Sequence, residues 1–159
     1  AKGKKVGIID LTRGELGTRG NEELRKQEAV AAAKIMGISV RENLAFADGF
    51  FQNDKAHQLK LISVIRKYQP DIVLANTLED RHPDHSRAAK LASDACFLSG
   101  LKKIVTKYQG EEQTQWRPNR VFHYLQSNYM KPDFVVDITA HWVKVKIIET
   151  RLLSQLPAL

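Results

Sequence analysis

Short apolar runs separated by polar stretches are the first regular feature of the chain. Four runs are rich in β-branched and aliphatic residues and a fifth is shorter; they cover 5–12, 43–46, 71–76, 121–126 and 134–139. Apolar runs of this length are typical of strands that are covered in a sheet. The pattern therefore predicts five strands at these places.

Amphipathic segments between these runs predict helices. Asn21 is a favourable N-cap and Gly37 a favourable stop, so one helix is expected to end near Met36. Further helices are expected over 55–68, 83–99 and 141–155. Strands that alternate with helices imply βαβ units. The expected fold class is therefore α/β, with a mostly parallel sheet and helices on both faces.

The ends of the chain suggest an incomplete domain. The first expected strand begins almost at residue 1, and the last expected helix stops soon after it starts. A length of 159 residues suffices for one domain with its own core. We therefore expect 1–159 to form a single, incomplete domain that is truncated at both ends.

Composition indicates the cellular compartment in which the protein is expected. No apolar run approaches the roughly 20 residues of a membrane helix, and the start of the chain does not resemble a signal peptide. The single cysteine, Cys96, rules out an internal disulfide framework and fits a reducing cytoplasm. Because Cys96 lies in an apolar stretch, a small core residue is favoured over a reactive thiol.

The net charge of +7 allows three kinds of partner: nucleic acid, an anionic membrane, or an acidic small molecule. The basic residues are interleaved with 18 acidic ones, and aromatic residues do not alternate with them as a base-stacking surface requires. Several arginines instead fall in two loops that follow expected strands. An anionic metabolite therefore explains their positions better than nucleic acid or a membrane.

The first of these loops covers 12–20 and contains a glycine at every third position, Gly14, Gly17 and Gly20. Glycine permits a positive φ and a close approach of the backbone to another group. Both a tight turn and a ligand-binding loop fit this pattern. Arg13 and Arg19 favour binding, because an arginine fork suits carboxylates and phosphates.

The second loop covers 77–85 and carries two histidines. Pro83 suits the first turn of a helix, which places His82 at the cap and His85 one turn along. At this spacing one imidazole can bind Zn²⁺ while the other acts as an acid or electrostatic donor, and Asp84 can orient a histidine. Surface capping by the histidines is the alternative. Both loops follow strands, so they can converge on one site at the carboxyl edge of the sheet.

The two loops together resemble a known family. DLTRGELGTRG at 10–20 and DRHPDH at 80–85 are similar to the LmbE-like (PIG-L) zinc-dependent N-acetylglucosamine deacetylases. The resemblance is closest to the bacillithiol-pathway branch, which deacetylates N-acetylglucosaminyl malate. It extends from about Val6 to Trp142, and it implies a Rossmann-like fold with one catalytic Zn²⁺.

The resemblance also implies roles for individual residues. His85 corresponds to a zinc ligand, and His82 to the residue that stabilises the oxyanion or protonates the leaving amine. Arg19 and Arg81 correspond to positions that face the substrate and suit the carboxylates of malate. Asp84 is assigned a catalytic role beside His82, and Arg13 and Glu15 are further candidate residues for substrate binding.

One family motif has no counterpart in this sequence. Members carry an AHPDD-type motif after their first strand, which supplies two more zinc ligands and the general base. The 159 residues contain no such motif, so we expect the chain to begin after it. A zinc ion held by His85 alone would bind weakly, because catalytic sites normally use three protein ligands.

The resemblance thus predicts a cytoplasmic, zinc-dependent deacetylase of a small sugar conjugate. It acts as a homo-oligomer and has no nucleic-acid or membrane partner. The alternative is a non-catalytic Rossmann-like module that binds an anionic small ligand or a nucleotide.

Overall fold

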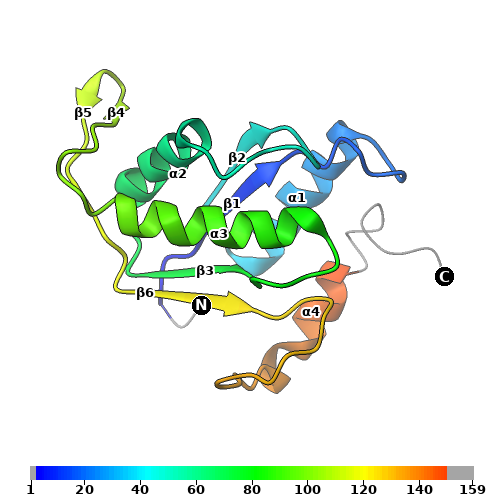
Figure 1. Ribbon diagram of the computed structural model, residues 1–159. Helices are drawn as coiled ribbons and strands as arrows, with labels where there is room; N and C mark the ends of the chain where they lie inside the picture. Colours follow the sequence, from blue (N-terminus) through cyan, green and yellow to red (C-terminus); the bar gives the residue numbers. More distant parts are fainter. Residues whose placement is uncertain (1–2, 150–159) are drawn as a thin grey trace. The chain divides into compact units, whose positions relative to one another are not determined.

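The computed structural model describes residues 3–149, which fall into two compact units (Figure 1). Unit 1 contains the described residues up to Asp48 together with those from Pro132 onward. Unit 2 contains Gly49–Lys131. The loop at 12–20 belongs to unit 1, and the loop at 77–85 belongs to unit 2. The single domain expected from the sequence stays a prediction.

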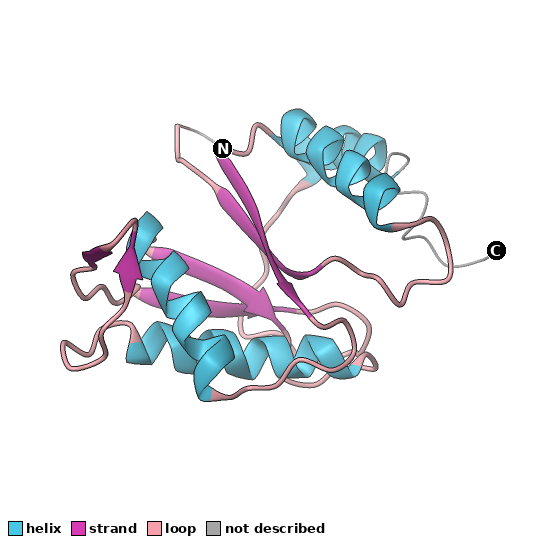
Figure 2. Ribbon diagram, turned by 90° about the horizontal axis from the view of Figure 1, so that it is seen from above, coloured by secondary structure: helices cyan, strands magenta, loops and turns pink. Residues whose placement is uncertain are grey.

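Unit 1 is built on a pair of parallel strands. β1 (Gly7–Thr12) pairs with β2 (Val40–Phe46) in parallel, and α1 (Glu22–Met36) connects them. A short 3₁₀ turn (Thr139–His141) leads into α4 (Trp142–Glu149), which lies against α1 (Figure 2). The parallel strand–helix–strand unit expected from the sequence is confirmed here.

The ends of α1 follow from local signals. The side-chain oxygen of Asn21 accepts a hydrogen bond from the amide of Leu24 at 2.8 Å, as an N-cap does. Gly37 adopts a left-handed conformation with φ 69°, and its amide bonds the last turn of the helix. Both predicted ends of this helix are confirmed.

Unit 2 contains a second parallel pair and two packed helices. Its elements are α2 (Lys55–Tyr68), β3 (Ile72–Asn76), α3 (Pro83–Leu98), β4 (Lys107–Tyr108), β5 (Glu111–Glu112) and β6 (Arg120–Tyr124). β3 and β6 pair in parallel, while β4 and β5 form a small antiparallel hairpin. α3 packs on α2 and contacts both β3 and β6 (Figure 1). This packing places the start of α3 beside the end of β3.

The core of unit 2 lies between α2, α3 and one face of the parallel pair. Along β3, Ala75 is buried while Ile72 and Leu74 are exposed, so one face of the strand is covered. Cys96 is buried in this core, and burial raises the pKa of its thiol to about 11. The prediction that Cys96 is a small core residue is confirmed by this burial. A thiol with a raised pKa stays protonated at neutral pH.

Two sequence expectations differ from the structure. The strand expected at 134–139 is wrong: 134–138 have no regular structure, and Thr139 begins the 3₁₀ turn. A strand requires a paired neighbour, and this apolar run has none among residues 3–149. The last helix begins at Trp142 rather than His141, and the rest of its expected span after 149 lies outside the described residues.

The fold class is α/β, as expected, with both parallel pairs formed across helical connections. Within residues 3–149 the strands form three two-stranded sheets. In the same part of the chain, none of the helices has the length and apolar composition needed to cross a membrane.

A buried arginine holds the segment that follows α3. Arg66 on α2 is 4% exposed, and burial lowers the pKa of its guanidinium. The guanidinium donates four hydrogen bonds of 2.6–3.0 Å to Ser99 O, Leu101 O, Ile104 O and Thr106 Oγ1. It thereby ties α2 to the C-cap of α3 and to the segment that follows, where Ser99 O and Leu101 O also accept from the amides of Trp116 and Ile104.

Replacing this arginine should destabilise the protein strongly. Arg66→Met keeps an apolar stem but removes four hydrogen bonds, so the free energy of unfolding should fall by about 3 kcal/mol. Urea unfolding followed by circular dichroism measures the change. Lys90→Met, at an exposed position of α3, is the control and should change it by less than about 0.5 kcal/mol. Equal, small changes in both variants would contradict the role of Arg66.

Candidate functional site

The histidine loop lies where β3 ends and α3 begins. Pro83 occupies the first turn of α3, and His82 is the N-cap residue with an extended backbone. The rings of His82 and His85 stack with their centroids 4.9 Å apart and their planes inclined by 24°. The structure therefore brings the two predicted histidines together on one side of the helix start.

The hydrogen bond of His82 identifies which of its nitrogens carries the proton. Its Nδ1 accepts a hydrogen bond from the amide of Asp84 at 3.2 Å. An accepting nitrogen is unprotonated, so the proton of the neutral ring resides on Nε2. His82 is exposed, and its Nε2–H can act as a donor toward a ligand.

Asp80 is the carboxylate beside the histidine pair. One oxygen, Oδ1, accepts from the amide of His82 at 2.9 Å and lies 3.1 Å from Nδ1 of His85. The other, Oδ2, accepts from the amide of Ser127 at 3.2 Å. The hydrogen bond from His82 is the main reason that the pKa of Asp80 falls from 3.8 to about 2. Asp80 is therefore an anion across the physiological range.

The contact between Asp80 and His85 is short, but it does not have the angles of a regular hydrogen bond. The side chain of Asp80 is fully buried, and Nδ1 of His85 is shielded from solvent. Among the described residues, Nδ1 has no hydrogen bond of regular geometry. A carboxylate accepts only, so Nδ1 must carry the proton for this contact to be favourable. The lone pair of Nε2 is then available to a metal ion.

Asp84 makes different contacts from those expected. Its carboxylate accepts from the amide of Gly49 at 2.7 Å and from Nη1 of Arg87 at 2.6 Å, and Arg87 also donates to the carbonyl of Gly49. Asp84 reaches His82 only through its backbone amide. The contact expected between the Asp84 carboxylate and a histidine ring is thus made by Asp80. The catalytic assignment of Asp84 stays a prediction.

The segment after β6 borders the same loop. Asn76 donates to the side chain of Gln126 at 2.7 Å, next to the bond between Ser127 and Asp80. His123 bonds the carbonyl of Asn76 through Nδ1 and contacts Ser93 through Nε2, so both of its ring nitrogens serve the packing of β6. Arg81, which the sequence predicts to face the substrate, is exposed.

The glycine loop of unit 1 is packed around a side chain of its own unit. A Cβ atom at Gly17 would overlap the guanidinium of Arg25, and one at Gly14 would come within 2.9 Å of it. Gly14 also has a φ of 68°, and the amide of Gly17 bonds its carbonyl at 3.1 Å. These contacts support the tight-turn interpretation of the glycines and make room for Arg25.

Glu15 holds this loop through backbone amides. Its carboxylate accepts from the amide of Asp48 at 3.0 Å and from that of Arg13 at 3.2 Å. Arg13 also forms an exposed ion pair with Glu22 at 3.4 Å. Arg19 is exposed. The roles of Arg13, Glu15 and Arg19 in binding substrate stay predictions, as does the convergence of this loop with the histidine loop of unit 2.

The metal-binding capacity of the described residues is limited. No group of three or more His, Cys, Asp or Glu side chains within residues 3–149 lies close enough to hold a metal ion. The protonation expected of His85 suits a single ligand, because neutral imidazole binds metals through an unprotonated nitrogen. The described residues therefore fit a zinc ion as one ligand of a larger set.

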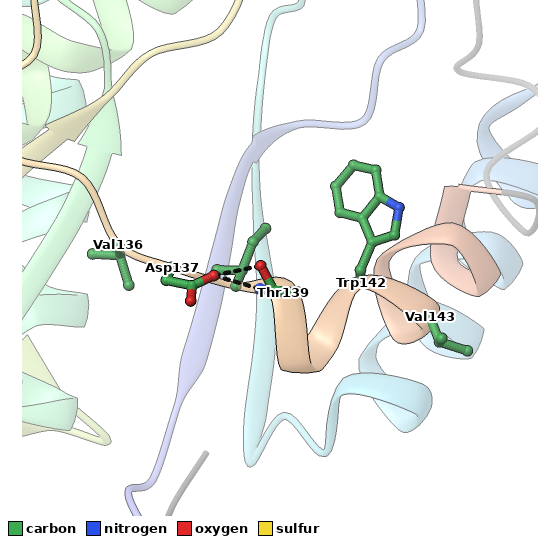
Figure 3. Close-up of a pocket in the computed structure, with 6 residues that line it drawn as sticks. Val136, Asp137, Thr139, Trp142 and Val143 are labelled. Carbon is green, nitrogen blue, oxygen red and sulfur yellow. Dashed lines mark hydrogen bonds between the residues drawn. The ribbon is translucent and has the colours of Figure 1, made fainter.

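An open hollow in unit 1 is less suited to chemistry. It has a volume of about 660 Å³ and is lined by Val136, Asp137, Ile138, Thr139, Trp142 and Val143 (Figure 3). The carboxylate of Asp137 accepts from both the amide and the hydroxyl of Thr139, which lowers its pKa. The acidic group of this hollow is thus satisfied locally, and none of the predicted catalytic residues lines it.

Fold and site together define a class: an α/β protein whose predicted site residues follow the carboxyl ends of parallel strands. The chain belongs to the PIG-L family, because the family model described as GlcNAc-PI de-N-acetylase matches residues 1–96.

Three similar proteins refine this assignment. The chain is 32% identical over 135 residues to the 4-oxalmesaconate hydratase of Pseudomonas putida, covering 83% of this chain and 51% of that protein. It is 29% identical over 170 residues to the diacetylchitobiose deacetylase of Thermococcus kodakarensis, covering 98% and 61%. A solved structure of a conserved Thermus thermophilus protein has a TM-score of 0.87 and 37% identity, covering 97% and 68%.

The chain thus spans about half to three fifths of the length of these two curated relatives. One of them is named for hydration and the other for deacetylation.

A double-mutant cycle tests the packing of the glycine loop. Gly17 lies outside the left-handed region, so Gly17→Ala should cost about 1–2 kcal/mol of stability purely by displacing Arg25. In an Arg25→Ala background the cost should fall below about 0.5 kcal/mol. Gly14→Ala is the control: its positive φ should still cost about 1 kcal/mol without Arg25. A cost of Gly17→Ala that is independent of Arg25 would contradict the packing role.

Proposed function

We propose that the protein is a zinc-dependent deacetylase of an N-acetylglucosamine conjugate, with N-acetylglucosaminyl malate of the bacillithiol pathway as the substrate. The observation that carries the proposal is a pair of stacked histidines whose Nδ1 atoms face opposite partners, an amide donor for His82 and a carboxylate for His85. With these partners, His85 would present an unprotonated Nε2 and His82 an Nε2–H donor. One metal ligand and one hydrogen-bond donor side by side are what amide hydrolysis requires.

His85 would hold the zinc ion from this chain. The other ligands and the general base belong, by the family resemblance, to the AHPDD-type motif that these 159 residues do not contain. When bound, zinc lowers the pKa of a coordinated water to about 7 and polarises a carbonyl group. The loop at 77–85 contributes orientation, since its cap and its buried carboxylate hold both rings.

His82 would act on the substrate. As water adds to the acetyl carbonyl, the oxygen gains negative charge that Nε2–H of His82 can stabilise. The C–N bond then breaks, the amine nitrogen takes up the proton that the general base removed from the water, and acetate and the free glucosamine conjugate leave. Loss of one hydrogen-bond donor to a developing oxyanion typically costs about 10²–10³-fold in rate.

The arginines account for the substrate class. Arg81 adjoins His82 and is exposed, and Arg19 is exposed in the glycine loop. Guanidinium groups bind carboxylates in a bidentate manner, which suits the malate portion of the conjugate. Arg13, Glu15 and Asp84 would shape the loops around the substrate. We place the protein in the cytoplasm as a homo-oligomer that binds neither nucleic acid nor membranes.

A second candidate is the addition of water to an unsaturated carboxylate. The 32% identity to a hydratase favours it. A bound water, a nearby N–H donor and exposed arginines serve this reaction as well. A non-catalytic module that binds an anionic ligand or nucleotide is the third possibility, and calorimetry with nucleotides and with N-acetylglucosaminyl malate separates it from the others.

Variants of three histidines test the proposal in the full-length protein. His85→Ala should lower zinc affinity by at least about 100-fold and abolish acetate release from N-acetylglucosaminyl malate. His82→Gln should keep the metal but lower kcat by about 10²-fold or more. His57→Ala is the control, because His57 forms its ion pair with Asp54 at the start of α2. It should change neither quantity.

Zinc content by mass spectrometry and acetate by a coupled assay provide the two measurements. Full metal content and full activity in His85→Ala would contradict the proposal. Hydration of an unsaturated dicarboxylate without any release of acetate would favour the second candidate instead.

A further inference from the structure

Asp80 is an unusual carboxylate for its position. Its side chain is fully buried, and burying a charge is costly unless hydrogen bonds or an opposite charge compensate it. Within residues 3–149 its ion-pair contacts of up to 4.0 Å involve only His85. Two backbone amides, those of His82 and Ser127, supply its hydrogen bonds. The anion is therefore stabilised by the same groups that shape the histidine loop.

We propose that Asp80 is a positioning residue that determines which nitrogen of the neutral His85 ring carries the proton and, through the cap, the direction of His82. The inference rests on the proposed function, in that His85 is taken as a metal ligand. Asp80 itself does not contact the substrate. It acts by keeping the proton of the neutral His85 ring on Nδ1, so that Nε2 presents its lone pair.

The neighbours of the two histidine rings favour opposite positions of the ring proton. In a free neutral imidazole the proton can reside on either nitrogen, and the partner of one nitrogen decides the state of the other. The amide of Asp84 donates to Nδ1 of His82, whereas Oδ1 of Asp80 faces Nδ1 of His85. One ring is therefore a donor at Nε2 and the other an acceptor at Nε2. Without Asp80 the second assignment would be lost.

The geometry of the Asp80–His85 contact should affect metal binding by His85. Nδ1 of His85 is buried, so water cannot replace Asp80 as its acceptor. When a cation engages Nε2, positive charge spreads over the ring and makes Nδ1–H a stronger donor. The 3.1 Å contact should then become a regular hydrogen bond. Asp80 thus stabilises the metal-bound form of His85 more than the metal-free form.

The same carboxylate links the pair to a distant part of the chain. Oδ2 of Asp80 accepts from Ser127 at 3.2 Å, and the amide of Asp80 donates to the hydroxyl of Ser86 at 3.1 Å. These bonds come from the segment after β6 and from the first turn of α3. They restrain Asp80 from both sides, so that its carboxylate keeps its position and orients the ring of His85.

The first test requires no substitution. Nitrogen-15 NMR of the histidine rings in the metal-free, full-length protein at pH 8 reports which nitrogen is protonated. His85 should show a protonated Nδ1 and a bare Nε2, and His82 should show the reverse. A proton on Nε2 of His85 would overturn the proposal, whatever the variants do.

The second test measures zinc affinity by competition with a chelator. Asp80→Ala should weaken zinc binding by about 10–100-fold, as removal of a partner of a metal-binding histidine does. Asp80→Asn keeps an oxygen that can accept from His82 and His85, so it should recover part of this loss. If Asp80→Ala does not fold, the NMR result and the zinc affinity of Asp80→Asn test the proposal in its place.

Asp54→Ala is a matched control. Oδ1 of Asp54 accepts from the amide of His57 at 3.0 Å and lies 2.8 Å from its Nδ1, the same combination that Asp80 offers to two histidines. Asp54 also caps α2, so its loss should lower the denaturant midpoint of unfolding without changing zinc affinity.

The outcomes separate this inference from the proposed function. If His85→Ala leaves zinc affinity unchanged, the proposed function fails. If His85→Ala weakens binding but Asp80→Ala does not, and the protonation of His85 is also unchanged, the role of Asp80 fails alone. An equal loss of affinity in Asp80→Ala and Asp54→Ala would indicate general destabilisation and likewise overturn the role of Asp80.

Discussion

A buried anion at the end of β3 is the constraint on which the histidine site depends. The carboxylate of Asp80 is removed from water, so N–H groups must surround it. The amides that do so, of His82 and Ser127, belong to the cap of α3 and to the segment after β6. Satisfying one charge therefore determines where the loop turns, where the helix begins and which way the histidine rings face.

Local signals predicted both ends of α1 and the start of α3. Asn21 with Gly37, and His82 with Pro83, act within one turn of the chain, so the sequence alone identifies them. Asp80 was harder to recognise as part of the site, because Ser127 lies 47 residues away. Its local signal was an acceptor two residues before the amide of His82, as in an Asx turn. The strand expected at 134–139 failed for a related reason, since pairing depends on a distant partner and not on the apolar run itself.

The glycine loop shows why a local pattern can have two explanations. Glycines at 14 and 17 permit a ligand to approach the backbone, and they equally permit a side chain to do so. In this structure the guanidinium of Arg25 occupies that space. Spacing alone could not separate the two, because the group that fills the space comes from α1. The arginines of the same loop, Arg13 and Arg19, remain exposed, so packing by Arg25 and binding by the other two are compatible.

The proposed roles of the two histidines would account for similarity to both a hydratase and a deacetylase. In either reaction a water molecule attacks and negative charge develops on an oxygen close by. Under the proposal, a ring with a bare Nε2 would hold a metal and a ring with an Nε2–H would stabilise the new charge. Neither role distinguishes an acetyl carbonyl from a double bond beside a carboxylate. The choice of reaction would therefore depend on the residues that place the substrate, and we propose the exposed arginines for this role rather than the cap of α3.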